Sequence, residues 1–327
     1  MKVRNMKTKN IKFSGARELG VLIVLILIMI IMSIASPMFL KFDNLINIVR
    51  QTVEIGIMAI GMTYLIIAGE LDLSIGSLFA TCAMLAGFFF KTEVIPPTLV
   101  FFLILLCGIA LGCVNGLLVT RVNIPSFIVT LGTMKIFRSF AYAIGNGKSI
   151  SQFPESATNS WVWKMGAKIN GLPVQIFIMI ALFIVFGIVL KKTTYGYKVY
   201  ATGGNPKAAQ LSGINVKNTK LIAFGLMGLM CSASALISTT YLETVTTTSG
   251  QGREMDAIAA VILGGAALSG GRGTILGTFI GAIIMATVKN GMVLLNVPVF
   301  WQDGFIGIVV ILAVLVDTII HRKDTKR

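Results

Sequence analysis

The chain has 327 residues, of which 55% are hydrophobic and only 13% are charged. This apolar share exceeds what a soluble core can bury, so lipid must solvate much of the surface. The formal net charge of +15 does not indicate nucleic acid, because Lys and Arg cluster between apolar runs, as topology signals do. We therefore expect an all-α polytopic membrane protein that contacts membrane lipid and binds no nucleic acid.

Metal sites and enzyme active sites are not indicated. Cys82, Cys107, Cys113 and Cys231 lie inside apolar runs without paired metal-ligand spacing, and the single histidine, His321, lies in a terminal basic tail. The sequence has no phosphate loop of the form Gly-x-x-x-x-Gly-Lys-Ser/Thr. We expect no metal, no catalytic residue and no cofactor bound by this chain.

The apolar runs predict about ten membrane spans. The first run, 19–35, follows a basic tail and resembles a signal peptide. We interpret it as a retained span, because it is longer than a usual signal core and further spans follow. The other runs are 46–68, 74–90, 98–119, 124–145, 172–190, 221–241, 256–269, 274–292 and 301–320, of which 256–269 is short and interrupted by glycine.

The basic residues predict the topology. With the N-terminus inside, most Lys and Arg residues fall on the inner side, and the positive-inside rule places both termini in the cytoplasm. We expect one transmembrane domain over 19–320, with cytoplasmic basic tails at 1–18 and 321–327 and a cytoplasmic coupling loop at 191–220.

A short internal similarity suggests a repeat. Asn115-Gly116 precedes Ile124-Pro125, as Asn290-Gly291 precedes Val297-Pro298. In the predicted topology the first pair faces in and the second faces out. Spans two to five and seven to ten then form a candidate inverted repeat, which lets two halves rock about a site at the midplane. Chance similarity is the alternative.

Polar residues interrupt the apolar sequence between the second and third spans. Glu70, Asp72 and Ser74 predict that the chain unwinds here and restarts as a helix. Either the broken helix presents these groups to a polar substrate, or the acids close an inner turn and cap the third span; for Asp72 we favour the cap. The candidate translocation-path or gating residues are Glu70, Asp72, Ser74, Asn115 and Asn290.

Charges inside the membrane need partners. Arg50 and Glu54 are spaced to pair along one helix face, and Lys289 and Asp303 lie at matched depth, which suggests a second pair.

Glycine is dense over 264–273, where it predicts either a hinge at the inner mouth or close helix packing. For Gly277 and Gly281, four residues apart within one span, we favour packing.

A polar segment at 195–216 separates two long apolar runs. Asn205 followed by Pro206 is a helix start signal, and Gly213 is placed to end that helix after about two turns. The segment resembles the coupling helix of ABC importer permeases, which docks in a cleft of an ATPase subunit. The family usually has an acidic residue where Lys207 stands, and the alternative is an ordinary basic loop. The candidate coupling residues are Gly203, Gly204, Asn205, Pro206, Lys207, Ala208, Ala209, Leu211, Ser212 and Gly213.

Several motifs in one order extend this resemblance from roughly 44 to 317. They lie at 69–77, 123–134, the coupling segment and 257–273. Together they make the chain resemble the ribose-type, simple-sugar ABC importer permeases. The resemblance implies a vitamin-B12-importer-like permease fold of ten spans, in a bacterial cytoplasmic membrane. It also implies a non-catalytic subunit that forms the translocation path for a monosaccharide or similar small polyol. The implied partners are an ABC ATPase subunit that uses ATP, an extracytoplasmic sugar-binding protein, and a second permease subunit that is identical or paralogous.

Two other transporter classes share some of these features. A stand-alone secondary transporter would have inverted repeats and intramembrane charges, but would need no docking helix. Branched-chain amino-acid ABC permeases share much of the architecture, although Leu71-Asp72-Leu73-Ser74 looks more like the sugar branch. A membrane-embedded enzyme has little support, because the acids are dispersed.

Overall fold

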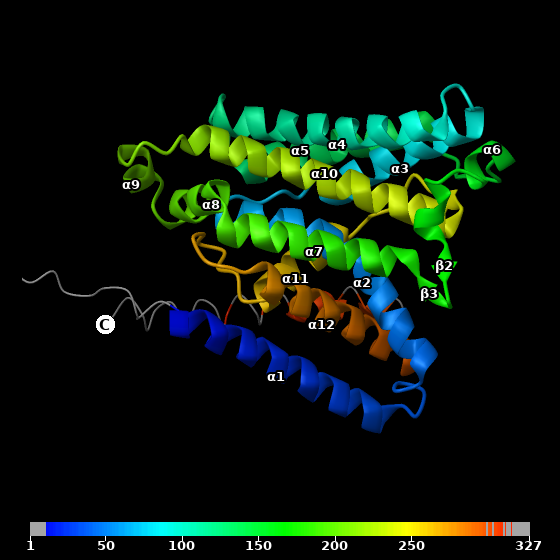
Figure 1. Ribbon diagram of the computed structural model, residues 1–327, viewed down its shortest axis with the longest axis horizontal. Coiled ribbons are helices and arrows are strands. Elements are labelled where there is room, and N and C mark those ends of the chain that lie inside the picture. Colours follow the sequence, from blue (N-terminus) through cyan, green and yellow to red (C-terminus); the bar gives the residue numbers. More distant parts are fainter. Residues whose placement is uncertain (1–10, 299, 303, 310, 312–314, 316–327) are drawn as a thin grey trace, which may run out of the picture.

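The computed structural model describes residues 11–298, 300–302, 304–309, 311 and 315. Its long helices lie side by side in one bundle (Figure 1). The helices are α1 (Ile11–Ala35), α2 (Phe42–Ile67), α3 (Ile75–Thr92), α4 (Pro97–Thr120), α5 (Ser126–Gly145), α6 (Glu155–Thr158), the 3₁₀ helix η1 (Trp163–Gly166), α7 (Val174–Lys192), α8 (Thr194–Gly204), α9 (Pro206–Leu211), α10 (Val216–Leu242), α11 (Arg253–Leu263) and α12 (Ile275–Leu294).

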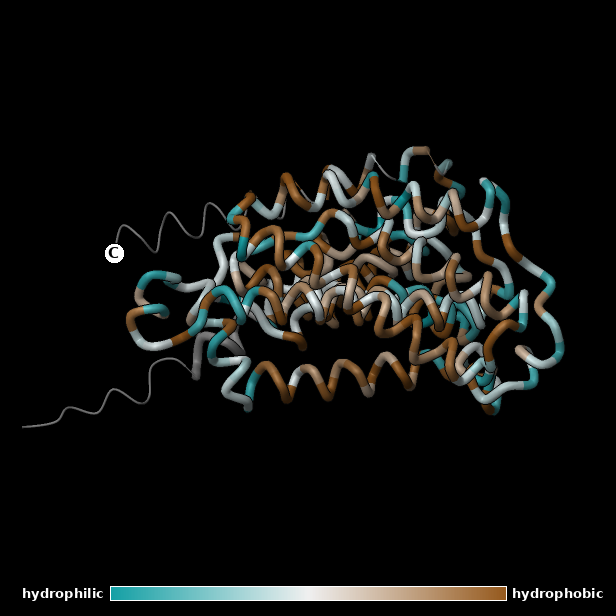
Figure 2. The backbone as a smooth tube through the Cα atoms, turned by 90° about the horizontal axis from the view of Figure 1, so that it is seen from above, coloured by the Kyte–Doolittle hydropathy of each residue, from teal (hydrophilic) through white to brown (hydrophobic). Residues whose placement is uncertain are grey.

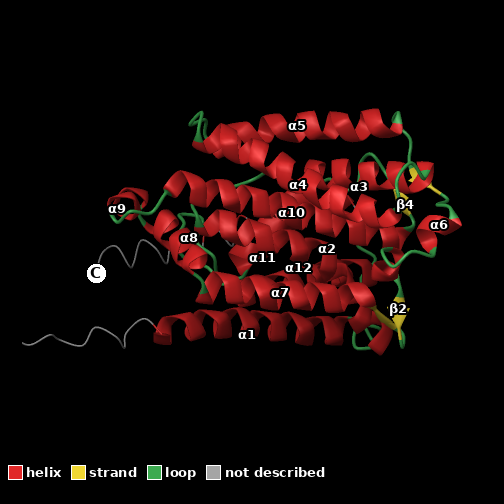
Figure 3. Ribbon diagram, turned by 45° about the horizontal axis from the view of Figure 1, so that its top comes forward, coloured by secondary structure: helices red, strands yellow, loops and turns green. Residues whose placement is uncertain are grey.

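Short strands and the coupling segment lie at opposite ends of the bundle (Figure 3). Strands β1 (Ile150–Ser151) and β4 (Thr244–Val245) pair antiparallel, as do β2 (Lys168–Ile169) and β3 (Leu172–Pro173). We call this the strand end, and the end that carries α8 and α9 the coupling end. Hydrophilic residues gather mainly at these two ends, while the middle of the bundle is mostly hydrophobic (Figure 2). This distribution matches a protein that spans a membrane.

Eight of the described helices are long and apolar enough to cross a membrane. They are α1, α2, α3, α4, α5, α7, α10 and α12, and they correspond in order to the first seven predicted spans and the ninth. This confirms the all-α polytopic fold class. Half of the tenth predicted span, 301–320, lies outside the described residues, and the inverted repeat stays a prediction.

The eighth predicted span is wrong, because α11 has only 11 residues and is not among the helices long enough to cross a membrane. We predicted 256–269, but the helix α11 ends at Leu263. Gly264 and Gly265 follow, and Gly265 has a φ of 88°, a left-handed conformation that glycine adopts without steric cost. Residues 264–274 therefore form an irregular loop between α11 and α12.

The helix α2 lies at the centre of the bundle. It is buried continuously from Ile55 to Ile67, and it contacts α7, α8, α10, α11 and α12. By contrast, α1, α4, α5 and α7 expose many large apolar side chains. These outer helices face lipid, since exposed apolar surface is favourable only in that solvent.

Gly277 and Gly281 pack against α11, as predicted. A Cβ atom at Gly277 would lie 2.1 Å from the carbonyl oxygen of Gly264, and one at Gly281 would lie 2.0 Å from that of Ala260. Only glycine permits this approach of α12 to α11.

Candidate functional site

A buried polar cluster forms at the segment 68–74, which joins α2 to α3. Asp72 Oδ1 accepts hydrogen bonds from the Ser74 backbone N at 2.8 Å and from Ser74 Oγ at 2.6 Å. From α4, Asn115 Nδ2 donates to Ser74 Oγ at 2.8 Å and to Asp72 Oδ2 at 3.2 Å. All three side chains are completely buried. The Asp72 carboxylate thus closes a turn onto Ser74, the residue before α3, and α3 itself has no side-chain cap. The predicted capping of the third span by Asp72 is therefore wrong.

The Asp72 carboxyl group in this cluster has a shifted pKa. Burial raises the pKa of Asp72 above its ordinary value, while the hydrogen bonds from Ser74 and Asn115 oppose that rise. Asn115 Oδ1 has no hydrogen-bond partner among the described residues. A buried carbonyl oxygen without a partner costs free energy, so it marks a place where the structure is not fully satisfied in this conformation.

The other two predicted path residues lie apart from this cluster. Glu70 Oε1 pairs with Lys220 Nζ at 2.6 Å, which joins the broken segment to the start of α10. Asn290 forms two amide hydrogen bonds with Asn44, at 2.9 and 3.0 Å, near the strand end of α12. The structure thus brings Asp72, Ser74 and Asn115 together and places Asn290 elsewhere.

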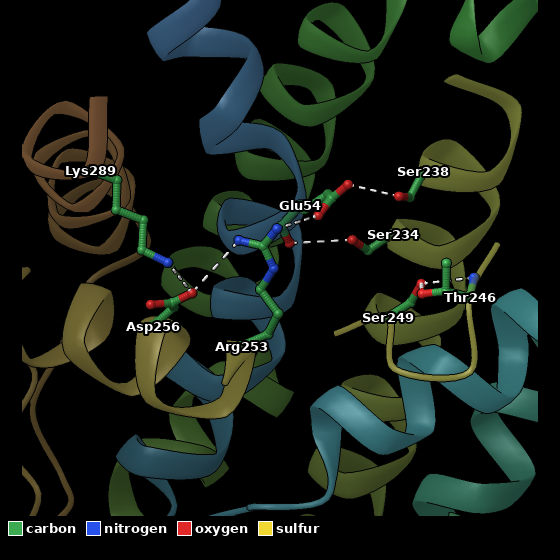
Figure 4. Close-up of polar contacts among 8 residues, drawn as sticks. All are labelled: Glu54, Ser234, Ser238, Thr246, Ser249, Arg253, Asp256 and Lys289. Carbon is green, nitrogen blue, oxygen red and sulfur yellow. Dashed lines mark hydrogen bonds and ion pairs between the residues drawn. The ribbon is translucent and has the colours of Figure 1, made fainter. Parts of the chain in front are cut away.

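A charged network that the sequence did not predict connects four helices (Figure 4). Lys289 Nζ of α12 lies 2.6 Å from Asp256 Oδ2 of α11. Arg253 pairs with Asp256 at 3.6 Å and with Glu54 Oε2 of α2 at 2.9 Å. Glu54 Oε1 in turn accepts a hydrogen bond from Ser238 Oγ of α10 at 2.7 Å. Two cations and two carboxylates balance, which is the condition for charge inside a membrane.

The predicted Arg50–Glu54 pair is wrong. The Arg50 guanidinium instead donates two hydrogen bonds to Asn47 Oδ1 and lies over the Tyr241 ring at 5.0 Å from its centroid. Asp303 of the other predicted pair lies outside the described residues, and Lys289 pairs with Asp256. The opposite charges of Arg253 and Asp256, three residues apart before an apolar run, were the signal that could have revealed the network.

The coupling segment folds as two short helices, α8 and α9. Asn205 caps α9, because its Oδ1 accepts a hydrogen bond from the Ala208 backbone N at 3.0 Å, and Pro206 occupies the first turn. Gly213 follows the helix with a φ of 83°. The predicted start and end signals are therefore confirmed.

The surface of α9 has one prominent apolar residue. Leu211 is 91% exposed, and Lys207 and Ala208 are also exposed, whereas Ala209 is buried. One exposed leucine is ordinary on a protein surface, so Leu211 shows that this face of α9 is open to contact and does not by itself define an interaction site. Ala209 belongs to the support beneath α9 and not to this surface.

The α8 helix rests directly on the end of α2. A Cβ atom at Gly203 would lie 1.7 Å from the Ile67 carbonyl oxygen and 2.6 Å from the Gly271 backbone N. Gly271 N donates a hydrogen bond to the same Ile67 oxygen at 2.8 Å. Tyr200 Oη also donates to the Gly273 carbonyl oxygen at 2.7 Å. The coupling helices, the glycine loop and the last residue of α2 thus meet at one point, next to the broken segment.

This structure defines a class of protein before any comparison. A bundle of apolar helices around a buried central helix, with a short exposed and capped helix at one end, is the build of a multi-spanning membrane protein. Comparisons with known proteins then identify its family. The family model described as "Branched-chain amino acid transport system / permease component" matches residues 44–314. The chain belongs to this family of permease components.

Curated relatives extend over almost the whole chain. The ribose import permease protein RbsC of Bacillus subtilis is 39% identical, over 97% of this chain and 98% of its own length. RbsC of Escherichia coli is 39% identical over 90% of this chain and 92% of its own length. The xylose transport system permease protein XylH of Escherichia coli is 31% identical over 95% of each chain. No solved structure matches the chain significantly.

Proposed function

We propose that this chain is the permease subunit of an ATP-driven importer and forms the translocation path for a monosaccharide or a similar small polyol. The relatives that support a sugar as the substrate are named for ribose import and xylose transport. The family description names branched-chain amino acids, but it covers permease components more broadly, since it also matches a chain so close to ribose permeases. A stand-alone secondary transporter is not favoured by these relatives.

Two observations support the proposal that a partner ATPase drives transport. Leu211 is exposed on α9, and α8 packs closely against the Ile67 carbonyl oxygen at the end of α2. An ABC ATPase subunit would bind α9 from the cytoplasm. The coupling end would therefore face the cytoplasm, and both termini would also be cytoplasmic. ATP would be bound and hydrolysed by the partner, and this chain would supply the path and the lever. The other partners proposed are an extracytoplasmic sugar-binding protein and a second permease subunit, and the membrane is a bacterial cytoplasmic membrane.

The lever follows from the contacts at the coupling end. Movement of α9 toward the partner chain would shift α8, which has no space to slide past Ile67 without moving it. Ile67 ends α2, so the shift would reach the broken segment and the cluster of Asp72, Ser74 and Asn115. We assign this cluster a gating role, in which it sets the start of α3 relative to α4. Such a change lets the bound sugar face one side and then the other.

A pull-down tests the partner part of the proposal. The tagged chain is extracted from its native membrane in mild detergent, and stoichiometric partners are identified by mass spectrometry. We expect an ATPase with a phosphate loop, lost in Leu211→Glu because a carboxylate replaces the apolar contact. The matched control is Ile169→Glu, since Ile169 is 59% exposed on β2 at the strand end. Recovery of the chain without an ATPase from intact wild-type complexes would contradict the proposal.

A further inference from the structure

A cavity of about 540 Å³ opens between α7, α12 and the start of α1 at the coupling end. Its walls are apolar side chains of α7 and α12, and Phe183 and Phe279 form its back, with ring centroids 4.9 Å apart. Ile184, Ile188 and Leu276 on these walls are 57%, 55% and 55% exposed. The volume of the cavity lies in the range of ligand-binding pockets. Its apolar lining suits a hydrocarbon chain.

Polar groups line only one end of this cavity. They are Glu18, Lys191, Lys192, Tyr200 and Thr274, all at the coupling end. Neither the Lys191 nor the Lys192 ammonium group forms a salt bridge with a residue that the structure describes. The Glu18 carboxylate accepts a hydrogen bond from Thr274 Oγ1 at 2.8 Å. Two lysines against one carboxylate leave the end of the cavity net positive.

We propose that this cavity binds one anionic glycerophospholipid from the leaflet at the coupling end. An acyl chain would lie along the apolar walls, and the phosphate would bind Lys191 and Lys192 at the headgroup level. Basic residues at the end of an apolar crevice between spans are the arrangement that recognises anionic lipid headgroups. A phospholipid supplies both parts, an acyl chain for the apolar walls and one anionic phosphate for the basic end.

The test is native mass spectrometry of the full chain, titrated with phosphatidylglycerol or with phosphatidylcholine of the same acyl chains. We expect the wild type to bind one phosphatidylglycerol more tightly than any phosphatidylcholine. Replacing both lysines, Lys191→Gln with Lys192→Gln, should weaken that first site about thirtyfold. The matched control, Lys198→Gln with Lys217→Gln, removes two exposed lysines at the same end that do not line the cavity and should leave the site unchanged.

A second variant tests the acyl-chain part. A Cβ atom at Gly187 has only ordinary contacts, at 3.6 and 3.8 Å to Ile275, so Gly187→Leu fills the cavity without a backbone clash. It should abolish the tight site, while Gly132→Leu, on a surface with open space around it, should not. Equal binding of both lipids by the wild type, or unchanged binding in either test variant, would overturn the proposal. A shift of the monomer–dimer ratio by Gly187→Leu with unchanged lipid binding would place a second copy in the cavity and would also overturn it.

Discussion

Lys289 Nζ lies 2.6 Å from Asp256 Oδ2, so an ion pair joins α12 to α11 within the bundle. Asp256 Oδ2 also lies 3.6 Å from Arg253 Nη1, and the Asp256 side chain is only 5% exposed. The Asp256 carboxylate contacts both cations of the charged network in Figure 4, and it is the anion that pairs with Lys289, whereas Arg253 also pairs with Glu54.

Neutralising Asp256 should destabilise the protein more than neutralising Lys289. Asp256→Asn leaves Lys289 without its anion and removes one of the two anions near Arg253, which keeps Glu54, at a cost of about 1–3 kcal/mol. Lys289→Gln leaves Asp256 paired with Arg253 and should cost less. Thermal unfolding in detergent measures both. A larger loss of Tm in Lys289→Gln than in Asp256→Asn would contradict this account of the network.

Asp72 should tolerate asparagine but not alanine. An amide at position 72 still offers an oxygen to the Ser74 backbone N and removes a buried charge, so Asp72→Asn should keep the fold and most of the transport. Asp72→Ala removes the acceptor of the Ser74 backbone N and Oγ, while Asn115 Nδ2 keeps its bond to Ser74 Oγ, and the buried Ser74 donors cost about 1–3 kcal/mol. Tm and sugar uptake are measured side by side. Loss of uptake in a fully folded Asp72→Asn would show that the charge itself acts on the sugar or its path.

Gly203 and Gly204 should respond differently to alanine. At Gly203 a Cβ atom would lie 1.7 Å from the Ile67 oxygen, whereas at Gly204 no atom lies within 4 Å. Gly203→Ala must push α8 away from α2, which costs about 1–3 kcal/mol and should sharply reduce ATP-driven uptake.

Gly204→Ala is the matched control, since it makes the same chemical change one residue along the same helix. It should keep the wild-type Tm, and it should reduce uptake much less than Gly203→Ala does. If both variants transported equally well, the contact between α8 and Ile67 would not be the lever.

The features that local sequence determines were predictable. An apolar run of about 20 residues forms a span whatever packs on it, whereas the short run at 256–269 did not, and Asn205-Pro206 caps α9 through bonds within four residues. The expectation at Arg50 and Glu54 was wrong because tertiary neighbours supplied better partners, namely Tyr241 for Arg50 and Arg253 for Glu54. Helix spacing does not show such partners, since Arg253 is far from Glu54 in sequence.

The candidate site was predictable only in part for the same reason. Asp72 and Ser74 were recognisable together because they lie two residues apart in a break between apolar runs. That Asn115 completes their cluster, while Asn290 pairs with Asn44, depends on how α4 and α12 pack in the bundle. Likewise, the exposure of Leu211 and the burial of Ala209 depend on how α9 sits on its neighbours.

The central claim is that this chain imports a sugar with energy from a partner ATPase. The most direct measurement is uptake of labelled ribose, xylose or leucine into vesicles that hold the chain with the ATPase and binding protein that copurify with it. The account predicts uptake of a monosaccharide that requires ATP on the coupling side, fails in Leu211→Glu and persists in Ile169→Glu. Uptake that proceeds without ATP, or that carries leucine and neither sugar, would contradict it.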